Sequence, residues 1–291
     1  MNSLRDIKQR IANISSTEQI IKAMDMIAST KLQKVRAQLE GVRPIYKELK
    51  RVVDEVGCHK GAEAHMFYNN RGVEVKNTLY IIITSDRGLS GSYNANIMSK
   101  ALNHMNEEGK NEKILIVGSK GFEYFKRRNK NIIRTVTDLT DAQVYYLTES
   151  VANWVTDFYL SGKVEEVYLA YTHFESVLSY IPYVEKLLPI ENKGMICEDD
   201  GRKYEPDIKT FIDHMVPLYL HMNLFRAFSE SHTSEQAARM VNMSAAGKNA
   251  EEIIEDLTRM YNRKRQAVIT QELSEIVGSA NILNKGELHD K

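Results

Sequence analysis

Hydrophobic residues recur at helical spacing over a long stretch at the start of the chain. The pattern runs from Leu4 to Val56 with one internal glycine, Gly41, and one internal proline, Pro44. It predicts a single helix about 80 Å long at ~1.5 Å per residue. We expect Gly41 and Pro44 to bend or loosen the helix where they occur.

The apolar positions of this stretch follow a heptad pattern in two runs. The first run is Leu4, Ile7, Ile11, Ile14, Ile21, Met24 and Ala28, and the second is Leu32, Val35, Leu39, Val42, Tyr46, Leu49, Val53 and Val56. The step of four from Ala28 to Leu32 comes where the first run requires three. We therefore expect a stutter there, which locally relaxes a left-handed supercoil.

The C-terminal stretch, from Ile208 to about Leu283, has the same character. Asp207 follows Pro206 and is a suitable N-cap, whereas Pro217 inside the pattern predicts a kink. If continuous, this helix is about 110 Å long. The small residues 244–250 allow close helix approach. Each terminal helix needs a partner for its apolar face, and we expect the two to pair.

Strands and helices alternate between the terminal helices. Residues 57–76 resemble a connector, and the apolar run Thr78–Thr84 predicts a strand buried on both faces. Further strands are predicted at 113–117 and 132–136, helices at about 94–108, 118–128 and 142–160, and a β-hairpin at 166–174 and 177–188. This order predicts a doubly wound, Rossmann-like parallel sheet with an added edge. The predicted parts are therefore residues 1–56, 57–76, 77–206 and 207–291.

Composition narrows the class of protein. The chain has 39 Lys and Arg against 39 Asp and Glu, which argues against a broadly basic nucleic-acid binder. Its two cysteines, Cys58 and Cys197, are too few for a disulfide framework and favour a reducing compartment. No apolar run approaches the ~18 residues of a membrane span, and no secretory signal is visible. The first 56 residues are mildly basic, which fits either a solvated face or an acidic partner.

Motifs for catalysis, cofactors and metals are missing from the sequence. The segment Gly88–Gly91 follows the first strand but is not G-x-G-x-x-G, and no phosphate-binding P-loop occurs. Ser90 lacks the nucleophile-elbow context, and Gly118–Gly121 follows a strand instead of joining two helices. His214 and His221 are about 10 Å apart along a helix, and Cys58, His59 and His65 lack a fourth ligand. We expect no cofactor, no metal and no enzyme activity in the isolated chain.

Four motifs, in order, resemble one family. Residues 20–32, IIKAMDMIASTKL, resemble its I-x-K-A-M-x-M-V-A-x-x-K-[ML] segment, and residues 84–91, TSDRGLSG, resemble T-S-D-[RK]-G-L-C-G. Residues 234–240, SEQAARM, and 261–277, YNRKRQAVITQELSEIV, match its C-terminal helix almost position by position. Over nearly its whole length the chain resembles the gamma subunits of the rotary F-type ATP synthases.

The resemblance implies a mechanical role. In that family the terminal helices form an antiparallel coiled coil inside a hexamer of alpha and beta subunits. The α/β domain joins the epsilon subunit and the membrane c-ring. Proton or sodium flow turns the shaft, and the beta subunits carry the nucleotide chemistry. The resemblance thus implies a non-catalytic rotor shaft, peripheral to the cytoplasmic face of a bacterial membrane.

The resemblance also supplies candidate contact residues for the alpha/beta hexamer. They are Lys22, Met24, Arg239, Arg265, Gln266, Thr270 and Glu272. Taken without the resemblance, Arg265 and Gln266 are typical of a solvated helix face. With it, Arg265 is expected to form bidentate pairs with a carboxylate that can be remade at each angular stop. Met24 is expected in the coiled-coil core or against the surrounding subunits, because a thioether suits shifting surfaces.

Some positions depart from the family pattern. Ser90 and Ser92 stand where Cys and Gly are common, so no reactive thiol is expected in that loop. Cys197 has no neighbouring cysteine as in plant chloroplast members, so we expect no disulfide switch. The start of the sequence directly at the helix favours a bacterial protein. Two alternatives remain open: a nucleotide-binding α/β enzyme that oligomerises through its terminal helices, and an archaeal or vacuolar-type stalk, against which residues 77–190 count.

Overall fold

The computed structural model describes residues 3–59, 61–69, 74–138, 143–191 and 204–286, with side chains up to residue 277. By its internal contacts the chain divides into two compact units. The first, which we call the helix-pair unit, contains residues 1–26 and 243–291. The second, the sheet unit, contains residues 27–242. Each unit is described separately below.

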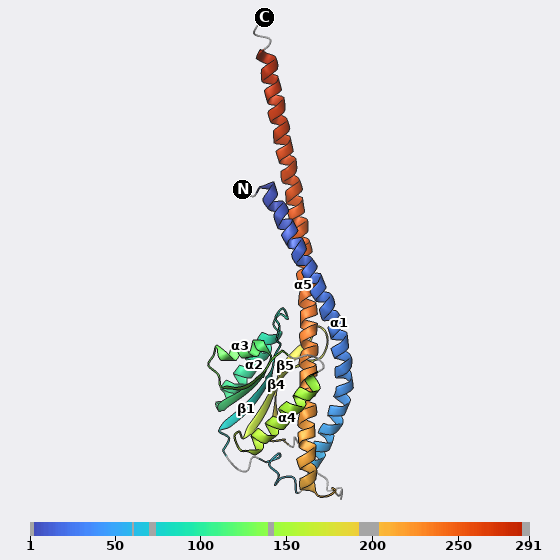
Figure 1. The fold of residues 1–291 in the computed structure, drawn as a ribbon, viewed down its shortest axis with the longest axis vertical. Helices are drawn as coiled ribbons and strands as arrows, with labels where there is room; N and C mark the ends of the chain where they lie inside the picture. Colours follow the sequence, from blue (N-terminus) through green and yellow to red (C-terminus); the bar gives the residue numbers. More distant parts are fainter. Residues whose placement is uncertain (1–2, 60, 70–73, 139–142, 192–203, 287–291) are drawn as a thin grey trace. The chain divides into compact units, whose positions relative to one another are not determined.

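Both predicted terminal helices are present. Helix α1 spans Leu4–Gly57 and continues through Pro44, and helix α5 spans Ile208–Gly286 and continues through Pro217 (Figure 1). Asp207 caps α5 as predicted, because its Oδ1 accepts a hydrogen bond from the Thr210 N–H at 2.9 Å and its Oδ2 one from the Thr210 hydroxyl at 2.7 Å. These hydrogen bonds lower the pKa of Asp207.

The sheet unit contains one five-stranded sheet with the order β3-β2-β1-β4-β5. The strands are β1 (Asn77–Ile83), β2 (Asn111–Val117), β3 (Ile132–Val136), β4 (Glu166–Phe174) and β5 (Tyr180–Leu188). Strands β1 to β4 pair in parallel, and β5 pairs antiparallel with β4. Helices α2 (Tyr93–Glu108), α3 (Ser119–Lys126) and α4 (Val144–Leu160) connect the parallel strands. The predicted parallel sheet with an added edge strand is confirmed.

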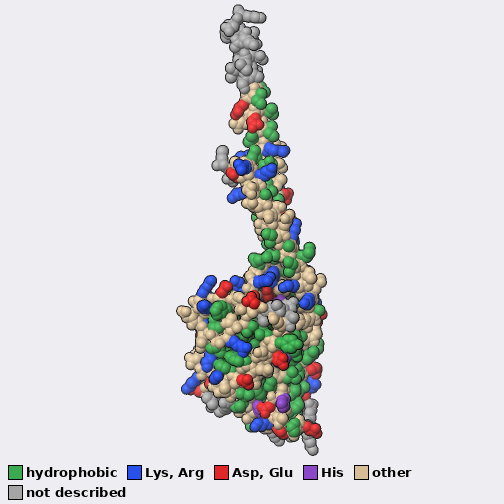
Figure 2. All heavy atoms as spheres, viewed as in Figure 1, with side chains coloured by type: hydrophobic (Ala, Val, Ile, Leu, Met, Phe, Trp, Pro, Cys, Tyr) green, Lys and Arg blue, Asp and Glu red, His purple; other side chains and the backbone are tan. Residues whose placement is uncertain are grey.

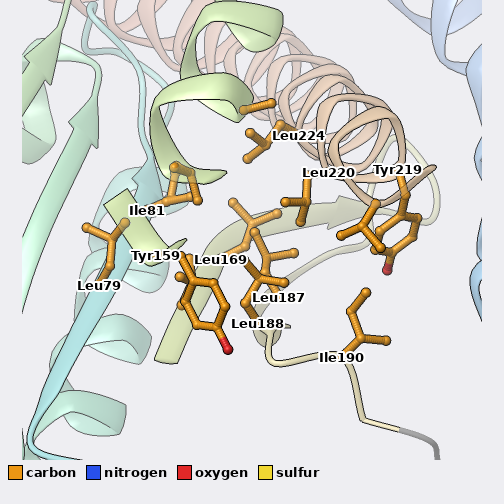
Figure 3. Close-up of a cluster of buried hydrophobic side chains, with 14 of the residues drawn as sticks. Leu79, Ile81, Tyr159, Leu169, Leu187, Leu188, Ile190, Tyr219, Leu220 and Leu224 are labelled. Carbon is orange, nitrogen blue, oxygen red and sulfur yellow. The ribbon is translucent and has the colours of Figure 1, made fainter. Parts of the chain in front are cut away.

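Alternate residues of the central strands enter two separate cores. Tyr80 and Ile82 of β1 pack with α2 and α3, together with Ile97 and Phe125. The intervening residues of β1 pack on the opposite face with α4, α5 and the end of α1. Figure 3 shows this second core, in which Leu79, Ile81 and Leu169 of the sheet face Tyr159 of α4 and Leu220 and Leu224 of α5; the remaining labelled side chains are Leu187, Leu188, Ile190 and Tyr219.

The middle of α5 is a buried central helix. Nearly every residue from 219 to 238 is buried, since α1 lies along one side of it and the sheet with α4 along the other (Figure 1). The sequence predicts only a two-helix rod here, and that interpretation is incomplete. Many of the buried residues are polar, including Asn223, Arg226 and Glu230, so their hydrophilic character hides the all-round burial.

The predicted connector is packed against the second core. Ala62 and Phe67 are fully buried, and the Tyr159 hydroxyl donates a hydrogen bond to the Met66 carbonyl at 2.9 Å. At its start Cys58 is disulfide-bonded. This bond was not anticipated from the cysteine count, which favoured a reducing compartment, and the expectation of no disulfide switch stays a prediction. Cys197, the other cysteine, lies outside the described residues.

Candidate interaction surface

The helix-pair unit is held together by a heptad seam on each helix. On α1 the less exposed residues are Leu4, Ile7, Ile11, Ile14, Glu18, Ile21 and Asp25, at alternating steps of three and four, and Ala28 and Leu32 continue the alternation. The predicted stutter is therefore wrong. It arose because the sequence reading counted only apolar residues, skipped Glu18 and took Met24 in place of Asp25.

The seam of α5 follows the same alternating steps of three and four and contains both small and large side chains. It contains Met243, Gly247, Ala250, Ile254, Leu257, Tyr261, Lys264 and Val268. The two helices run antiparallel, since Gly247 lies next to Ile21, Glu251 pairs with Lys22, and Lys264 acts electrostatically on Asp6. The expected antiparallel pairing of the terminal helices is confirmed in this unit.

Acidic residues occupy part of this seam. Glu18 accepts a hydrogen bond from Lys22 at 2.5 Å, and Lys22 also pairs with Glu251 at 2.8 Å. These two carboxylates raise the pKa of Lys22, Glu18 being the larger cause. The Asp25 Oδ1 atom is buried and has no hydrogen-bond partner among the described residues. This part of the seam is consequently polar where a coiled coil is ordinarily apolar.

Beside this polar stretch, α1 exposes large apolar side chains. The exposed fractions are 58% for Ile20, 37% for Met24 and 72% for Met26. Met24 therefore lies outside the seam, so its expected place in the coiled-coil core is wrong, and contact with surrounding subunits stays a prediction. Lys22 lies on the same stretch with its side chain 57% exposed, although its ammonium group is already paired within the unit.

The C-terminal part of α5 lies beyond the first turn of α1 and has no helix beside it in the described part of the unit (Figure 1). Of the sequence-predicted site residues, Thr270 and Glu272 lie here, whereas Arg265 and Gln266 follow Lys264, near the level of Asp6 in the first turn of α1; all four are exposed. Among the described residues, Arg265 and Glu272 form no ion pair. The Thr270 hydroxyl donates only to the Gln266 carbonyl of its own helix, at 2.9 Å.

Apolar residues accompany these polar ones. Ile269, Leu273, Ile276 and Val277 are 46–64% exposed, and Figure 2 shows hydrophobic side chains beside charged ones over this part of α5. A run of large exposed apolar side chains is typical of a surface that a partner covers. These four residues were not among the candidate contact residues that the family resemblance supplied. The signal that could have found them is the register, because the described part of α1 begins near the level of Lys264 on α5.

Arg239 differs from the other predicted residues. Its side chain is only 13% exposed and pairs with Glu235 at 2.6 Å. Its guanidinium also donates to the Gly88 carbonyl at 3.2 Å and to the Gln236 side chain at 3.0 Å. The adjacent Gly91 (φ 57°) has Asn242 so close that a Cβ would lie 2.5 Å from its Nδ2 atom. Arg239 thus holds the loop after β1 against α5.

The carboxyl end of β1, where an α/β sheet commonly binds a ligand, is filled by the chain itself. The Asp86 carboxylate accepts hydrogen bonds from the Ser119 N–H and hydroxyl at the start of α3, both at 2.9 Å, and from the Asp138 N–H at 3.0 Å. Gly118 (φ 100°) approaches so closely that a Cβ would lie 2.3 Å from the Thr84 carbonyl oxygen. Asp86 therefore occupies the position at the helix N-terminus that a bound phosphate would take.

The part of the chain that the structure describes lacks two further features. It contains no group of three or more His, Cys, Asp or Glu side chains placed to hold a metal ion. None of its helices combines the length and the apolar character needed to cross a bilayer.

Known proteins are similar in sequence to this chain over nearly its whole length. A family profile described as ATP synthase matches residues 3–283. The ATP synthase gamma chain of Desulforamulus reducens is 38% identical over 285 residues, covering 97% of this chain and 100% of the relative. The gamma chain of Alkaliphilus metalliredigens is 38% identical over 287 residues, covering 96% of this chain and 98% of the relative.

Solved structures share the fold. A central-stalk chain of the Tetrahymena thermophila mitochondrial ATP synthase aligns with a TM-score of 0.58 and 23% identity, covering 78% of this chain and 99% of that chain. A chain of the Euglena gracilis mitochondrial ATP synthase, in an OSCP/F1/c-ring structure, aligns with a TM-score of 0.68 and 18% identity, covering 98% and 95%. At these identities the structures establish the fold, and the full-length relatives establish the family. This chain belongs to the ATP synthase gamma chain family.

Proposed function

We propose that this chain is the central rotor shaft of an F-type ATP synthase and has no catalytic site of its own. Its helix-pair unit lies inside the hexamer of alpha and beta subunits, and its sheet unit binds the epsilon subunit and the c-ring. The observation that carries the proposal is the bare end of α5, where exposed Ile269, Leu273, Ile276 and Val277 alternate with Arg265, Gln266, Thr270 and Glu272. Such a surface is favourable only when a partner covers it.

Rotation works through contacts that differ between angular positions. A shaft shifts the conformational equilibrium of a beta subunit only if it binds one conformation better than another. The exposed apolar residues supply a bearing surface without preferred direction. Arg265 and Glu272 supply directional charged contacts that form at some angles and break at others.

The other predicted contact residues fit this scheme in different ways. Met24 presents a flexible thioether beside Ile20 and Met26, which suits a surface that moves past several partners. Lys22 can pair with a hexamer carboxylate by exchanging Glu251 for it. Arg239 is proposed to act through the loop at Gly88, which it holds at the surface, because its own guanidinium is engaged inside the chain.

The same proposal covers the reaction and the location. The beta subunits hold the nucleotide, in keeping with the Asp86 carboxylate at the start of α3. The complex lies on the cytoplasmic face of a bacterial membrane, with this chain as a peripheral subunit. The division into residues 1–56, 57–76, 77–206 and 207–291 remains a prediction.

Purification from native membranes tests the proposal. The chain carries a tag, the membranes are solubilised mildly, and the recovered subunits are identified by mass spectrometry while ATPase activity is measured. We expect alpha and beta subunits in about threefold excess over this chain and no ATPase activity in the chain alone. ATPase activity of the isolated chain, or a stable complex without alpha and beta, would refute the shaft function.

The bare surface of α5 is tested by the double variant Arg265→Ala with Gln266→Ala. Both side chains are exposed, so the isolated chain should keep its melting temperature. ATP turnover of the assembled complex should fall about tenfold, which is the effect of losing ~1.4 kcal/mol of charged hydrogen bonding in the rate-limiting step. The matched control is Arg51→Ala, another exposed helical arginine, which should leave turnover unchanged. Normal turnover of the double variant in a verified assembly would remove both residues from the site.

A further inference from the structure

A strip of buried polar side chains on α5 faces the sheet. It contains Arg226, Glu230, Ser231 and Ser234, and all four are at most 6% exposed. The Ser231 hydroxyl accepts a hydrogen bond from the Thr172 N–H of β4 at 3.1 Å, and the Ser234 hydroxyl donates to the Thr172 carbonyl at 3.4 Å. Strand β4 is thus bound to α5 by polar contacts as well as by apolar packing.

Glu230 is the centre of this strip. Its side chain is 1% exposed and accepts hydrogen bonds from both α1 and β4. From α1, Arg43 donates Nε to Oε1 and Nη2 to Oε2, both at 2.9 Å. From β4, the Phe174 N–H donates to Oε2 at 2.7 Å, and His173 Nδ1 lies 3.0 Å from the same oxygen.

Arg43 of α1 contacts both α5 and β4. Besides its fork on Glu230, its Nη2 donates to the Phe174 carbonyl oxygen at 2.5 Å. Each of the three elements α1, α5 and β4 therefore bonds to the other two through Arg43, Glu230 and Phe174. A fork of this kind fixes orientation as well as distance, because both N–H groups must align with both carboxylate oxygens.

One turn earlier on α5, Arg226 makes a second tie of the same kind. Its Nη2 pairs with Glu185 of β5 at 2.8 Å, and its Nη1 donates to the Tyr171 hydroxyl of β4 at 3.0 Å. Its guanidinium also lies 4.3 Å from the ring centroid of Tyr46 on α1. The link to α1 is here a cation–π contact, which constrains direction less than the fork of Arg43 does.

We propose that Glu230, together with Arg43, is a positioning residue that clamps the sheet to both shaft helices, so that torque applied to the sheet turns α1 and α5 as one body. This inference rests on the proposed shaft function. Apolar packing is non-directional and resists sliding and twisting weakly, whereas a buried carboxylate with donors on two other elements resists both. Stability alone does not explain the pair, because well-packed apolar residues of the same volume would hold the helix at least as well.

The test measures torsional stiffness in the assembled complex. The hexamer is fixed to a surface and stalled, a probe is attached to the sheet unit, and the variance of the probe's angle is recorded. Glu230→Gln keeps the shape of the side chain but replaces two charged acceptor oxygens by one uncharged oxygen and an NH₂ group, which cannot accept. Two charged contacts, Arg43 with Glu230 and Arg226 with Glu185, resist twisting between the sheet and the helices. Because the variant weakens one of the two, we expect the angular variance to rise about twofold. Arg43→Gln should also raise the variance, and the double variant should raise it by less than the sum of the two, because both single variants weaken the same fork.

Thr233→Val is the matched control. Thr233 is fully buried on the same segment of α5, but its hydroxyl donates only to the Ser229 carbonyl of its own helix, at 2.7 Å. This variant should leave the variance unchanged even if it lowers the melting temperature. If Glu230→Gln does not assemble, Arg43→Lys keeps the charge and loses the fork, and it should still raise the variance.

The outcomes separate the clamp from the shaft function. Wild-type variance in an assembled Glu230→Gln or Arg43→Lys complex would overturn the clamp and leave the shaft function intact. An equal rise in Thr233→Val would also overturn it, since a general loss of stability would then explain the effect. Failure of the wild-type chain to assemble with alpha and beta would instead refute the shaft function.

Discussion

Glu166, at the first residue of β4, carries a side chain only 5% exposed between two lysines. Lys110 lies 2.7 Å from one of its oxygens and Lys186 2.9 Å from the other. Burial acts to raise the pKa of Glu166, but the two ammonium groups outweigh it, and the pKa lies below its ordinary value of 4.5. The carboxylates around both lysines likewise overcome burial and raise their pKa above the ordinary 10.5.

These directions predict how the triad contributes to stability across the pH range. A carboxyl with a lowered pKa stabilises the fold above pH 4.5 and loses this contribution as the pH falls through its folded-state pKa. The lysines, with raised pKa values, stabilise the fold below pH 10.5 and lose the contribution as the pH rises through theirs. Glu166→Gln should therefore lower the free energy of unfolding by about 2 kcal/mol at neutral pH.

Denaturant unfolding of the wild type and Glu166→Gln between pH 3 and pH 9 measures this effect. The difference in unfolding free energy should be constant above about pH 5 and shrink towards pH 3. Glu149→Gln, at an exposed position, is the control and should show little difference at any pH. A difference that grows on acidification would contradict the proposed origin of the pKa shift.

Residues like these mark where sequence analysis reaches its limit. The apolar seam positions Ile7, Ile14 and Ile21 could be predicted because hydrophobic residues report burial directly. Glu18 and Asp25 could not, since a charged residue enters a seam only when its surroundings accept it, and those belong to the other helix. Met24 was misplaced for the same reason.

At the scale of elements, two glycines differ in whether the structure leaves room for a side chain: it does at Gly247 and does not at Gly118. Gly247 lies in the seam of α5, and a Cβ there would lie 3.7 Å from Ile21, an ordinary contact distance. Gly247→Ala should raise the stability of the chain by about 0.5–1 kcal/mol, because alanine loses less backbone entropy in a helix. Gly118→Ala should destabilise it by about 3 kcal/mol, since its φ of 100° disfavours a side chain and the Thr84 carbonyl blocks the Cβ.

Thermal unfolding of the two variants checks this contrast. Gly247→Ala should melt a few degrees above the wild type. Gly41→Ala serves as the reference for helix propensity alone, since nothing lies within 4 Å of its Cβ position. A lower melting point for Gly247→Ala than for Gly41→Ala would mean that the two helices approach more closely than the structure shows.

The elements themselves were largely predictable, and their packing was not. The run Leu79–Ile83 identifies a strand buried on both faces, and Asp207 identifies the start of α5, because both signals are local. The burial of Arg226 and Glu230 is set by partners far along the chain, such as Glu185 and Arg43. The bare end of α5 follows only from counting the register of both helices.

For the whole molecule, buried and exposed charged residues differ in where they find their partners. Charged residues that are buried, such as Glu166, Arg226 and Glu230, find partners within the chain. The exposed Arg265 and Glu272 have no ion-pair partner among the described residues. Because Arg265 and Glu272 stand beside exposed apolar side chains at this end of α5, the surface depends on the assembly to cover it.

This dependence predicts that exposed apolar residues matter for the complex and not for the chain. Ile269 and Leu273 are 46% and 57% exposed, so Ile269→Ser with Leu273→Ser should change the free energy of unfolding of the isolated chain by no more than about 0.5 kcal/mol. In the complex, each side chain loses apolar area that the hexamer would bury, at roughly 25 cal/mol per Å². ATP-driven ion pumping should therefore fall, together with recovery of the intact assembly at low protein concentration.

Ile45→Ser is the matched control, because Ile45 is 54% exposed on α1 and lies outside the proposed hexamer-facing surface. It should change neither pumping nor assembly. Circular dichroism of the isolated chains and pumping by reconstituted complexes are the two measurements. A double variant that unfolds on its own would show that α5 needs these side chains internally. A double variant that assembles and pumps like the wild type would show that the hexamer does not cover the end of α5.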